Sequence, residues 1–276
     1  MNNVDMQKKK IQMAILMIAK DIEEVCDKYN IQYFISSGTM LGAIRHKGFI
    51  PWDDDFDIGM KRSEYDRFIE ICKRELDQNK YFIQDEYTEE NYAFSFCKIQ
   101  LNNTYFMESF SENVPIRHGI FVDVFPYDNI PNNEIKRRVF LIKNHLLKNI
   151  LWVKCGYGDN EHKKKLSYKI MKTISFLYSI KRLKKQRRKL LYKYNNTCTT
   201  KSFSSDYPRE QLNNSWFNDL KKYEFENTYF LGFKEFDTYL TFMYGNYMQL
   251  PPESQRISHT QTVVDFGPYD KVLEKI

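Results

Sequence analysis

The sequence has no long apolar run. Its longest uncharged apolar stretches, residues 13–19 and 173–180, are less than half of the roughly 20 residues that a helix needs to cross a bilayer. The first ten residues carry three lysines but neither an apolar segment nor a small-residue cleavage site, so they do not form a secretory signal. We therefore expect a protein without a membrane span that stays in the cytoplasm.

Cysteine, glycine and proline are also scarce. The five cysteines (Cys26, Cys72, Cys97, Cys155 and Cys198) are widely spaced and never form a CxxC pair, which argues against a disulfide framework and a zinc knuckle. We expect them to be small core residues. The 10 glycines and 8 prolines are too few for a fibrous chain, and aromatic residues, at 16%, are too many for a disordered one. The 276 residues therefore fold as one large domain or two small ones.

Acidic residues almost disappear between residues 161 and 193, where 13 Lys or Arg accompany a single acid. The whole chain carries +6, so this segment carries +12 and the remainder −6. Such a segment indicates an anionic partner, either phospholipid headgroups or nucleic acid. No nucleic-acid-binding motif accompanies the charge, so we expect a possible anionic membrane surface as partner, and no nucleic acid.

The same segment has helical periodicity. Leu166, Ile170, Ile174 and Leu177 recur at steps of four, four and three, opposite a lysine-rich face. This pattern is typical of a helix that lies in a membrane interface. It is equally typical of an ordinary packed helix with a solvated face.

The periodicity of apolar residues predicts an α+β protein whose mixed sheet is flanked by helices, with an added basic helical region. Thr39 is expected to cap one helix, and Ser63 with Asp66 to form a capping box for the next. Residues 195–214 form a polar stretch without a strand pattern. The predicted elements are helix 5–29, strand 31–35, helix 39–45, strand 55–60, helix 63–76, strands 81–87, 93–101 and 119–125, helices within 132–195, strands within 216–230, and helix 233–244.

Acidic residues alternate with apolar ones in the predicted strand 55–60. Asp55 and Asp57 share one face about 7 Å apart along the backbone, with Asp53 just before them, while Phe56 and Ile58 face the core. Crowded carboxylates repel one another unless a cation lies between them. Oxygen ligands without Cys or His select Mg²⁺ or Mn²⁺, and Mg²⁺ usually completes its shell with phosphate oxygens and water. The pattern therefore predicts a metal site that binds a phosphorylated compound.

Asp123 is a lone carboxylate in the otherwise apolar strand 119–125. Such a group is costly to bury unless it is paired or bound to metal. The alternative is a structural carboxylate satisfied by backbone amides or an arginine. Three acids on two neighbouring strands would hold two metal ions, one activating an acceptor hydroxyl and one steadying the leaving phosphate. In that scheme Asp123 is the base.

A small polar turn, residues 36–39, joins a predicted strand to a helix and offers amides and hydroxyls to a phosphate. Cations after this turn would neutralise a diphosphate. His46 is equally consistent with a solvated side chain, and Trp52 with a packing role rather than stacking on a base. The candidate substrate-binding residues are Ser37, Gly38, Thr39, Arg45, His46, Lys47, Trp52, Arg256 and His259.

These residues resemble the LicD family of phosphotransferases, whose relatives include fukutin and fukutin-related protein. The resemblance rests on residues 37–58 (SGTMLGAIRHKGFIPWDDDFDI), on residues 119–126 (GIFVDVFP), and on YGNYM and PP near the carboxyl terminus. It spans residues 10–130 and 215–260. The family is similar in fold to nucleotidyltransferases of the DNA polymerase beta type.

The resemblance implies a division of the chain and a set of ligands. Residues 1–130 would form a nucleotidyltransferase-like catalytic core, residues 131–200 a basic helical insert, and residues 201–276 a segment that completes the core. In nucleotidyltransferases of the DNA polymerase beta type, a Gly-Ser or Gly-Thr turn binds phosphate, and an acid-x-acid strand together with a third acid binds metal. The matching positions here are Gly38, Thr39, Asp55, Asp57 and Asp123. Asp53 and Asp54 add two acids to this run, which leaves open which two of the four acids between Asp53 and Asp57 bind metal.

The resemblance also implies transfer of phosphocholine from CDP-choline to a sugar hydroxyl, with release of CMP. The acceptor would be a lipid-linked precursor of a cell-surface glycan such as teichoic acid, capsule or lipopolysaccharide, and the enzyme would be peripheral at the inner face of the membrane. Aromatic side chains would enclose the quaternary ammonium group. The alternatives are ribitol or glycerol phosphate from a CDP donor, nucleotidyl transfer from a nucleoside triphosphate, and a non-catalytic membrane-binding protein.

Overall fold

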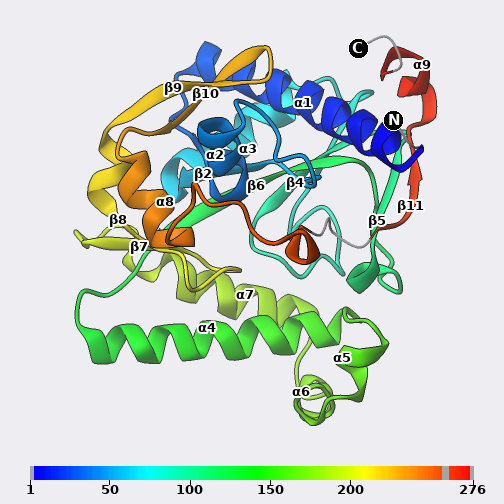
Figure 1. The fold of residues 1–276 in the computed structure, drawn as a ribbon. Coiled ribbons are helices and arrows are strands. Elements are labelled where there is room, and N and C mark those ends of the chain that lie inside the picture. Colours follow the sequence, from blue (N-terminus) through cyan, green and yellow to red (C-terminus); the bar gives the residue numbers. More distant parts are fainter. Residues whose placement is uncertain (1–2, 257–260, 274–276) are drawn as a thin grey trace.

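A mixed seven-stranded sheet lies at the centre of the described part of the chain, with α1 above it and α4 below it in Figure 1. The structure is a computed structural model that describes residues 3–256 and 261–273. Its helices are α1 Asn3–Tyr29, α2 Ser37–Arg45, α3 Arg62–Glu75, α4 Glu134–Lys154, α5 Asn160–Lys164, α6 Leu166–Ser175, α7 Ile180–Leu191, α8 Phe236–Tyr244 and α9 Asp270–Leu273. Its strands are β1 Phe34–Ile35, β2 Asp57–Lys61, β3 Tyr81–Gln84, β4 Cys97–Leu101, β5 Tyr105–Glu108, β6 Phe121–Asn129, β7 Lys201–Ser204, β8 Gln211–Asn213, β9 Leu220–Phe225, β10 Thr228–Phe233 and β11 Gln261–Asp265.

The order of the central strands is β1-β2-β6-β4-β3, and β7 and β8 continue from the far end of β6. Strands β2 and β6 are parallel, whereas the other neighbours in the sheet are antiparallel. Strands β9 and β10 form a separate hairpin, and β5 pairs with β11. The prediction of an α+β fold with a mixed sheet flanked by helices is confirmed.

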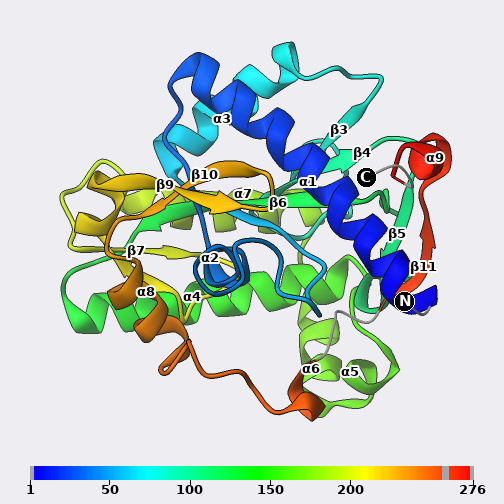
Figure 2. The same cartoon turned by 45° about the horizontal axis from the view of Figure 1, so that its top comes forward.

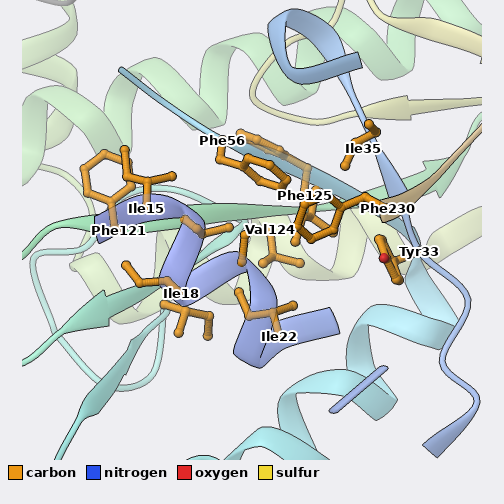
Figure 3. Close-up of a cluster of buried hydrophobic side chains, with 14 of the residues drawn as sticks. Ile15, Ile18, Ile22, Tyr33, Ile35, Phe56, Phe121, Val124, Phe125 and Phe230 are labelled. Carbon is orange, nitrogen blue, oxygen red and sulfur yellow. The ribbon is translucent and has the colours of Figure 1, made fainter. Parts of the chain in front are cut away.

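Helix α1 covers one face of the sheet, as its apolar spacing predicts. Ile15, Ile18 and Ile22 are fully buried and lie over Val124 of β6 (Figure 3). Val124 and its neighbours alternate along β6, because side chains of a strand point to opposite faces in turn. Val122 and Val124 share the face of β6 toward α1, whereas Asp123 lies on the opposite face between the buried Phe121 and Phe125.

The structure corrects two predicted helix caps. Ser36, not Thr39, stands at the N-cap of α2, and its side chain makes no capping hydrogen bond. Helix α3 begins at Arg62 and has Lys61 at its N-cap, so Ser63 and Asp66 do not form a capping box. Asp66 instead accepts a hydrogen bond from the Tyr192 hydroxyl at 2.6 Å. The Thr39 and Asp66 side chains, which local spacing assigned to helix caps, instead accept hydrogen bonds from distant parts of the chain.

The strands also differ from the predictions in places. Strand β2 begins at Asp57, so Asp55 lies in the extended segment before it rather than on it. The polar stretch 195–214 contains β7 and β8, which the sequence pattern does not show because each is short and mostly polar. Strand β5 was likewise missed. Helix α8 ends at Tyr244, and Gly245 follows at the C-cap with a positive φ of 66°, which favours glycine.

Helices fill the basic region as predicted, and together they form one end of the molecule in Figure 1. Arg187 of α7 anchors them, since its guanidinium is buried and donates to Asp206 at 2.8 Å and to the Ala93 carbonyl at 3.1 Å. Among the described residues, none of the helices has the length and apolar character of a membrane span. Four of the cysteines are buried as expected, but Cys198 is exposed. The domain boundaries given above remain a prediction.

Candidate active site

The pairing of β2 with β6 brings two carboxylates side by side. Asp57 and Asp123 are register partners at the start of the two parallel strands, and the Asp123 N–H donates to the Phe56 carbonyl at 3.1 Å. Phe56 and Ile58 are fully buried on the opposite side, so the alternation seen in the sequence is confirmed for this segment. Two acids 66 positions apart in the sequence thus meet at one edge of the sheet.

A cavity of about 310 Å³ opens at this edge. Acidic residues dominate its wall, and aromatic rings complete it. The described residues that line it are Ser37, Gly38, Asp53, Asp54, Asp55, Asp57, Phe106, Glu108, Phe121, Asp123, Phe125, Tyr207, Glu210 and Tyr244. No lysine or arginine is among them, so the wall has strong negative charge.

The burial and negative charge of the cavity affect the pKa of the Asp57 carboxyl. Burial raises the pKa of its carboxyl well above the ordinary value of 3.8, and the nearby carboxylates, led by Asp55 and then Asp123, raise it further. The backbone N–H of Asp57 donates to the Thr39 hydroxyl at 2.8 Å. Thr39 therefore lies behind the cavity wall and fixes the first residue of β2, whereas the sequence analysis placed it among the phosphate ligands.

A buried lysine, which the sequence analysis did not identify, lies beside Asp123. Lys98 of β4 is the antiparallel register partner of Asp123, and its ammonium lies 3.2 Å from Asp123 Oδ1 and 3.3 Å from Glu108 Oε2. It also lies over the Phe121 ring, 3.1 Å from the centroid. Asp123 thus has a cationic partner, as the structural alternative required, but that partner is a lysine shared with Glu108 rather than an arginine.

The small polar turn reaches the cavity through Ser37 and Gly38. The Ser37 N–H is the first backbone amide of α2, and it donates a hydrogen bond to the Tyr239 hydroxyl at 2.8 Å. A Cβ on Gly38 would lie only 2.8 Å from Asp53 Oδ2, so glycine here lets the Asp53 carboxylate approach the helix terminus. The turn is therefore part of the acidic wall as well as a candidate phosphate contact.

Glu210 is a further carboxylate that the sequence analysis missed. Burial raises its pKa above the ordinary 4.5, while hydrogen bonds from Tyr127 and Ser37 oppose that shift. The Tyr127 hydroxyl donates to it at 2.9 Å and the Ser37 hydroxyl at 3.3 Å. Glu210 follows β7 in a polar segment with no alternation, so no local signal marks it as a site residue.

Several predicted cationic and aromatic residues form a second cluster outside the cavity lining. Arg45 Nε donates to His46 Nε2 at 2.9 Å, and the His46 and Trp52 ring centroids are 6.2 Å apart. The Arg256 guanidinium lies 5.2 Å from the Trp52 ring. Trp52 is the immediate neighbour of the cavity residue Asp53, so this cluster adjoins the cavity in the chain. Burial and the adjacent Arg45 lower the pKa of His46.

One predicted residue, Lys47, does not join either group. Lys47 is exposed, and its carbonyl accepts from the Glu226 N–H at 2.7 Å, so its backbone ties α2 to the turn between β9 and β10. His259 lies outside the described residues.

The donor set of the cavity suits a hard divalent cation, because its polar side chains are carboxylates and hydroxyls. As they stand, no three Asp, Glu, His or Cys side chains within residues 3–256 and 261–273 are grouped as a finished metal site. Like charges move apart when no cation separates them, and Lys98 holds Asp123 from one side. Small side-chain rotations would be needed to bring the carboxylates onto one ion.

Residues 30–155 match the family described as LicD/FKTN/FKRP, nucleotidyltransferase domain. The lipopolysaccharide cholinephosphotransferase LicD of Haemophilus influenzae is 31% identical over 258 residues, which cover 90% of this chain and 94% of that protein. The chain belongs to the LicD family. An uncharacterized protein of Rickettsia typhi is 46% identical over 59 residues, or 21% of this chain and 19% of that protein.

The resemblance inferred from the motifs is thereby confirmed, and with it the expectation of a LicD-type phosphotransferase. In this LicD-family chain, the matched segment contains the cavity residues from Ser37 to Phe125. Tyr207, Glu210 and Tyr244 come from outside it. The cavity is therefore completed by a part of the chain that lies beyond the family domain.

Proposed function

We propose that this protein transfers phosphocholine from CDP-choline to a sugar hydroxyl of a cell-surface glycan precursor, with release of CMP. The Haemophilus influenzae relative, a lipopolysaccharide cholinephosphotransferase matched over nearly its whole length, supports the transferred group. The observation that carries the proposal is the apposition of Asp57 and Asp123 on neighbouring parallel strands in an acidic cavity. Ribitol or glycerol phosphate from a CDP donor is the alternative that the same cavity would accept.

A divalent cation, Mg²⁺ or Mn²⁺, is part of this proposal. A CDP donor carries negative phosphates, and a cavity wall of carboxylates without a lining lysine or arginine would repel it. Asp55, Asp57 and Asp123 would hold the cation, with Asp53 at the side next to Gly38. The bound cation would neutralise the donor phosphates and the charge that develops on the leaving CMP.

The transfer requires one bond to form, one bond to break and a proton to be accepted. The acceptor hydroxyl oxygen forms a bond to the phosphorus that bears choline, and the bond from that phosphorus to the CMP oxygen breaks with its electron pair going to CMP. Asp123 would accept the hydroxyl proton, with Lys98 holding its carboxylate in place. Arg45 and Arg256, in the cluster around Trp52, would bind the nucleotide end.

Aromatic side chains give the cavity a place for the choline group. Phe106, Phe121, Phe125, Tyr207 and Tyr244 share the wall with the acids, and Tyr207 contacts the edge of Phe125 with ring centroids 5.5 Å apart. Aromatic faces and carboxylates both attract a quaternary ammonium cation. The parallel β2–β6 pair with its paired acids also agrees with a nucleotidyltransferase-like fold, which we propose for this core.

The test is CMP release from CDP-choline with Mg²⁺ and a glycan acceptor. Asp57→Asn is expected to lower the rate at least about 100-fold, the scale of losing a central electrostatic group. It should not lower the midpoint of thermal unfolding, because it removes a buried charge from a crowd of like charges. Asp219→Asn, at an exposed residue of an ion pair, is the matched control and should retain activity.

Two results would end the proposal. One is the absence of CMP from CDP-choline, CDP-ribitol and CDP-glycerol with a folded protein. The other is pyrophosphate release from a nucleoside triphosphate in the same assay, which would identify a nucleotidyltransferase instead. An unchanged rate in Asp57→Asn would mean that the acidic cavity is not the active site.

A further inference from the structure

Helix α4 exposes a continuous apolar stripe. Ile135, Val139, Ile142 and Leu146 are between 43% and 75% exposed, and steps of four, three and four place them on one face. The face that packs on the protein is a different one, which includes the buried Phe140. An apolar helical face normally turns toward the core, so a stripe that turns to solvent needs another explanation.

Helix α6 carries further exposed apolar residues at the same end of the molecule. Met171 and Ile174 pack against the cluster that contains Ile150 of α4, which fixes α6 on the carboxyl-terminal half of α4. The remaining apolar residues of α6 and of the turn after it are exposed by 50% to 75%. They are Leu166, Ile170, Phe176 and Leu177. The predicted interfacial pattern at 166–177 therefore lies on a helix whose apolar side is only partly used for packing.

Both helices lie at the same end of the molecule. In Figures 1 and 2, α4 and α6 lie on the side away from α1 and α3, with the central sheet between the two groups. Residues 134–193, which include these helices, hold 19 Lys or Arg and three acids, whereas the rest of the chain holds 23 and 33. We call the exposed side of α4 and α6 the basic apolar face. The helical region thus carries net positive charge, and the rest of the chain carries net negative charge.

A groove between α4 and α7 combines both properties of this face. Its volume is about 540 Å³, and leucines and lysines share its lining: Leu146, Leu147, Leu190, Lys143, Lys189 and Lys193. An anionic phospholipid has the matching parts, since its phosphate attracts lysines and its acyl chain covers apolar side chains. Lysines beside an apolar helical face are the composition of helices that lie in the headgroup region of a membrane.

The geometry points to the basic apolar face as a docking surface for an anionic phospholipid membrane. A second copy of the chain is a poor occupant, because two faces with the same strong positive charge would repel each other. Nucleic acid would use the lysines but would leave the apolar stripes exposed to water. A membrane would contact both the lysines and the apolar stripes. The inference does not depend on which group the enzyme transfers.

The charge contribution is tested with vesicles of phosphatidylcholine alone and of phosphatidylcholine mixed with phosphatidylglycerol. The full-length protein should co-sediment with the mixed vesicles, bind the neutral ones far more weakly, and lose binding as salt is added. Lys169→Gln with Lys172→Gln, both exposed on α6, should weaken binding roughly 30-fold, on the scale of two interfacial lysines. Lys73→Gln with Arg74→Gln on α3 removes the same charge from the opposite side and should change binding less than about twofold.

The apolar contribution is tested with Ile170→Ser and Leu177→Ser, which should weaken vesicle binding at least about tenfold each. Met6→Ser, at a residue of α1 that is 49% exposed, is the matched control and should not change it. All of these positions are exposed, so the midpoint of thermal unfolding should stay the same and exclude misfolding as the cause.

Three results would overturn the proposal. Equal binding to neutral and anionic vesicles would remove the role of charge. Serine variants that bind vesicles normally, with DNA competing for the same lysines, would indicate nucleic acid as the partner. A dimer in size-exclusion chromatography that the serine variants convert to a monomer would make the face a contact between copies. Each of these measurements is independent of CMP release. The docking proposal can therefore fail while the proposed function holds, and the reverse.

Discussion

At the residue scale, the hydroxyl of Thr39 accepts a hydrogen bond from the backbone N–H of Asp57, the first residue of β2. We predict that Thr39→Val lowers the turnover number roughly tenfold or more, because a small displacement of Asp57 disturbs the reacting geometry. It should also lower the free energy of unfolding by about 1–3 kcal/mol, since the Asp57 N–H loses its acceptor. Steady-state kinetics and urea unfolding measure the two effects.

Thr39→Ser is the matched control for this prediction, because it keeps the hydroxyl and should keep the turnover number. A phosphate ligand would behave differently from a positioning residue. If Thr39→Val raises KM for the CDP donor and leaves the turnover number unchanged, the hydroxyl binds substrate, as the motif first suggested.

At the residue scale, the sequence predicted the acids well and their partners poorly. Asp57 stands out because it alternates with apolar residues, and Asp123 because it is a lone carboxylate in an otherwise apolar strand; both are local patterns. Lys98 and Glu210 carry no such pattern. They reach the site through the β4–β6 pairing and through the segment between β7 and β8, which local patterns do not contain.

At the scale of elements, a buried ion pair joins the basic helices to the wall of the acidic cavity. Arg187 of α7 and Asp206 are 2.8 Å apart and almost fully buried, and Asp206 directly precedes Tyr207 in the cavity wall. We predict that Asp206→Asn lowers the free energy of unfolding by about 3–5 kcal/mol, because it leaves the Arg187 charge buried without its partner. Urea unfolding at neutral pH measures this loss.

Asp219→Asn is the control for this pair. It removes a carboxylate that lies 2.8 Å from Lys234, but both side chains are 60% exposed, so the loss should stay below about 1 kcal/mol. Equal losses in the two variants would contradict the idea that the Arg187–Asp206 pair holds the helices on the core.

The same pair predicts a pH dependence. Burial alone would raise the pKa of Asp206, but Arg187 and then Lys148 more than offset this and hold it below the ordinary 3.8. A carboxyl with a lowered folded pKa contributes full stability above the unfolded pKa and loses it as pH falls through the folded pKa. The difference in unfolding free energy between wild type and Asp206→Asn should therefore be constant at neutral pH and shrink only below pH 3.8. A difference that shrinks already near neutral pH would refute this assignment.

At the scale of the whole molecule, the acidic cavity should make the fold respond to divalent cations. The crowded carboxylates repel one another in the absence of a cation, and an ion that binds only the folded state stabilises it by mass action. We predict a saturable rise in the midpoint of thermal unfolding as Mg²⁺ or Mn²⁺ is added, reversed by EDTA. Asp57→Asn should reduce the rise strongly.

Potassium chloride at matched ionic strength controls for general screening, which also relieves repulsion. A rise of the same size with potassium, or an undiminished rise in Asp57→Asn, would mean that divalent ions do not bind at these acids. In that case the proposed function would lose its cation, and the basis for CDP-donor binding would have to be found elsewhere in the cavity.

The sequence by itself determined what depends on neighbours along the chain: the buried face of α1, the acids that alternate with Phe56 and Ile58, and the basic helices. Only the tertiary structure decided which distant groups meet. It placed Asp123 beside Asp57, Lys98 beside Asp123, and Glu210 in the same wall. The physical reason is that periodicity records which face of an element is apolar, whereas strand order and register are set by packing between segments far apart in the chain.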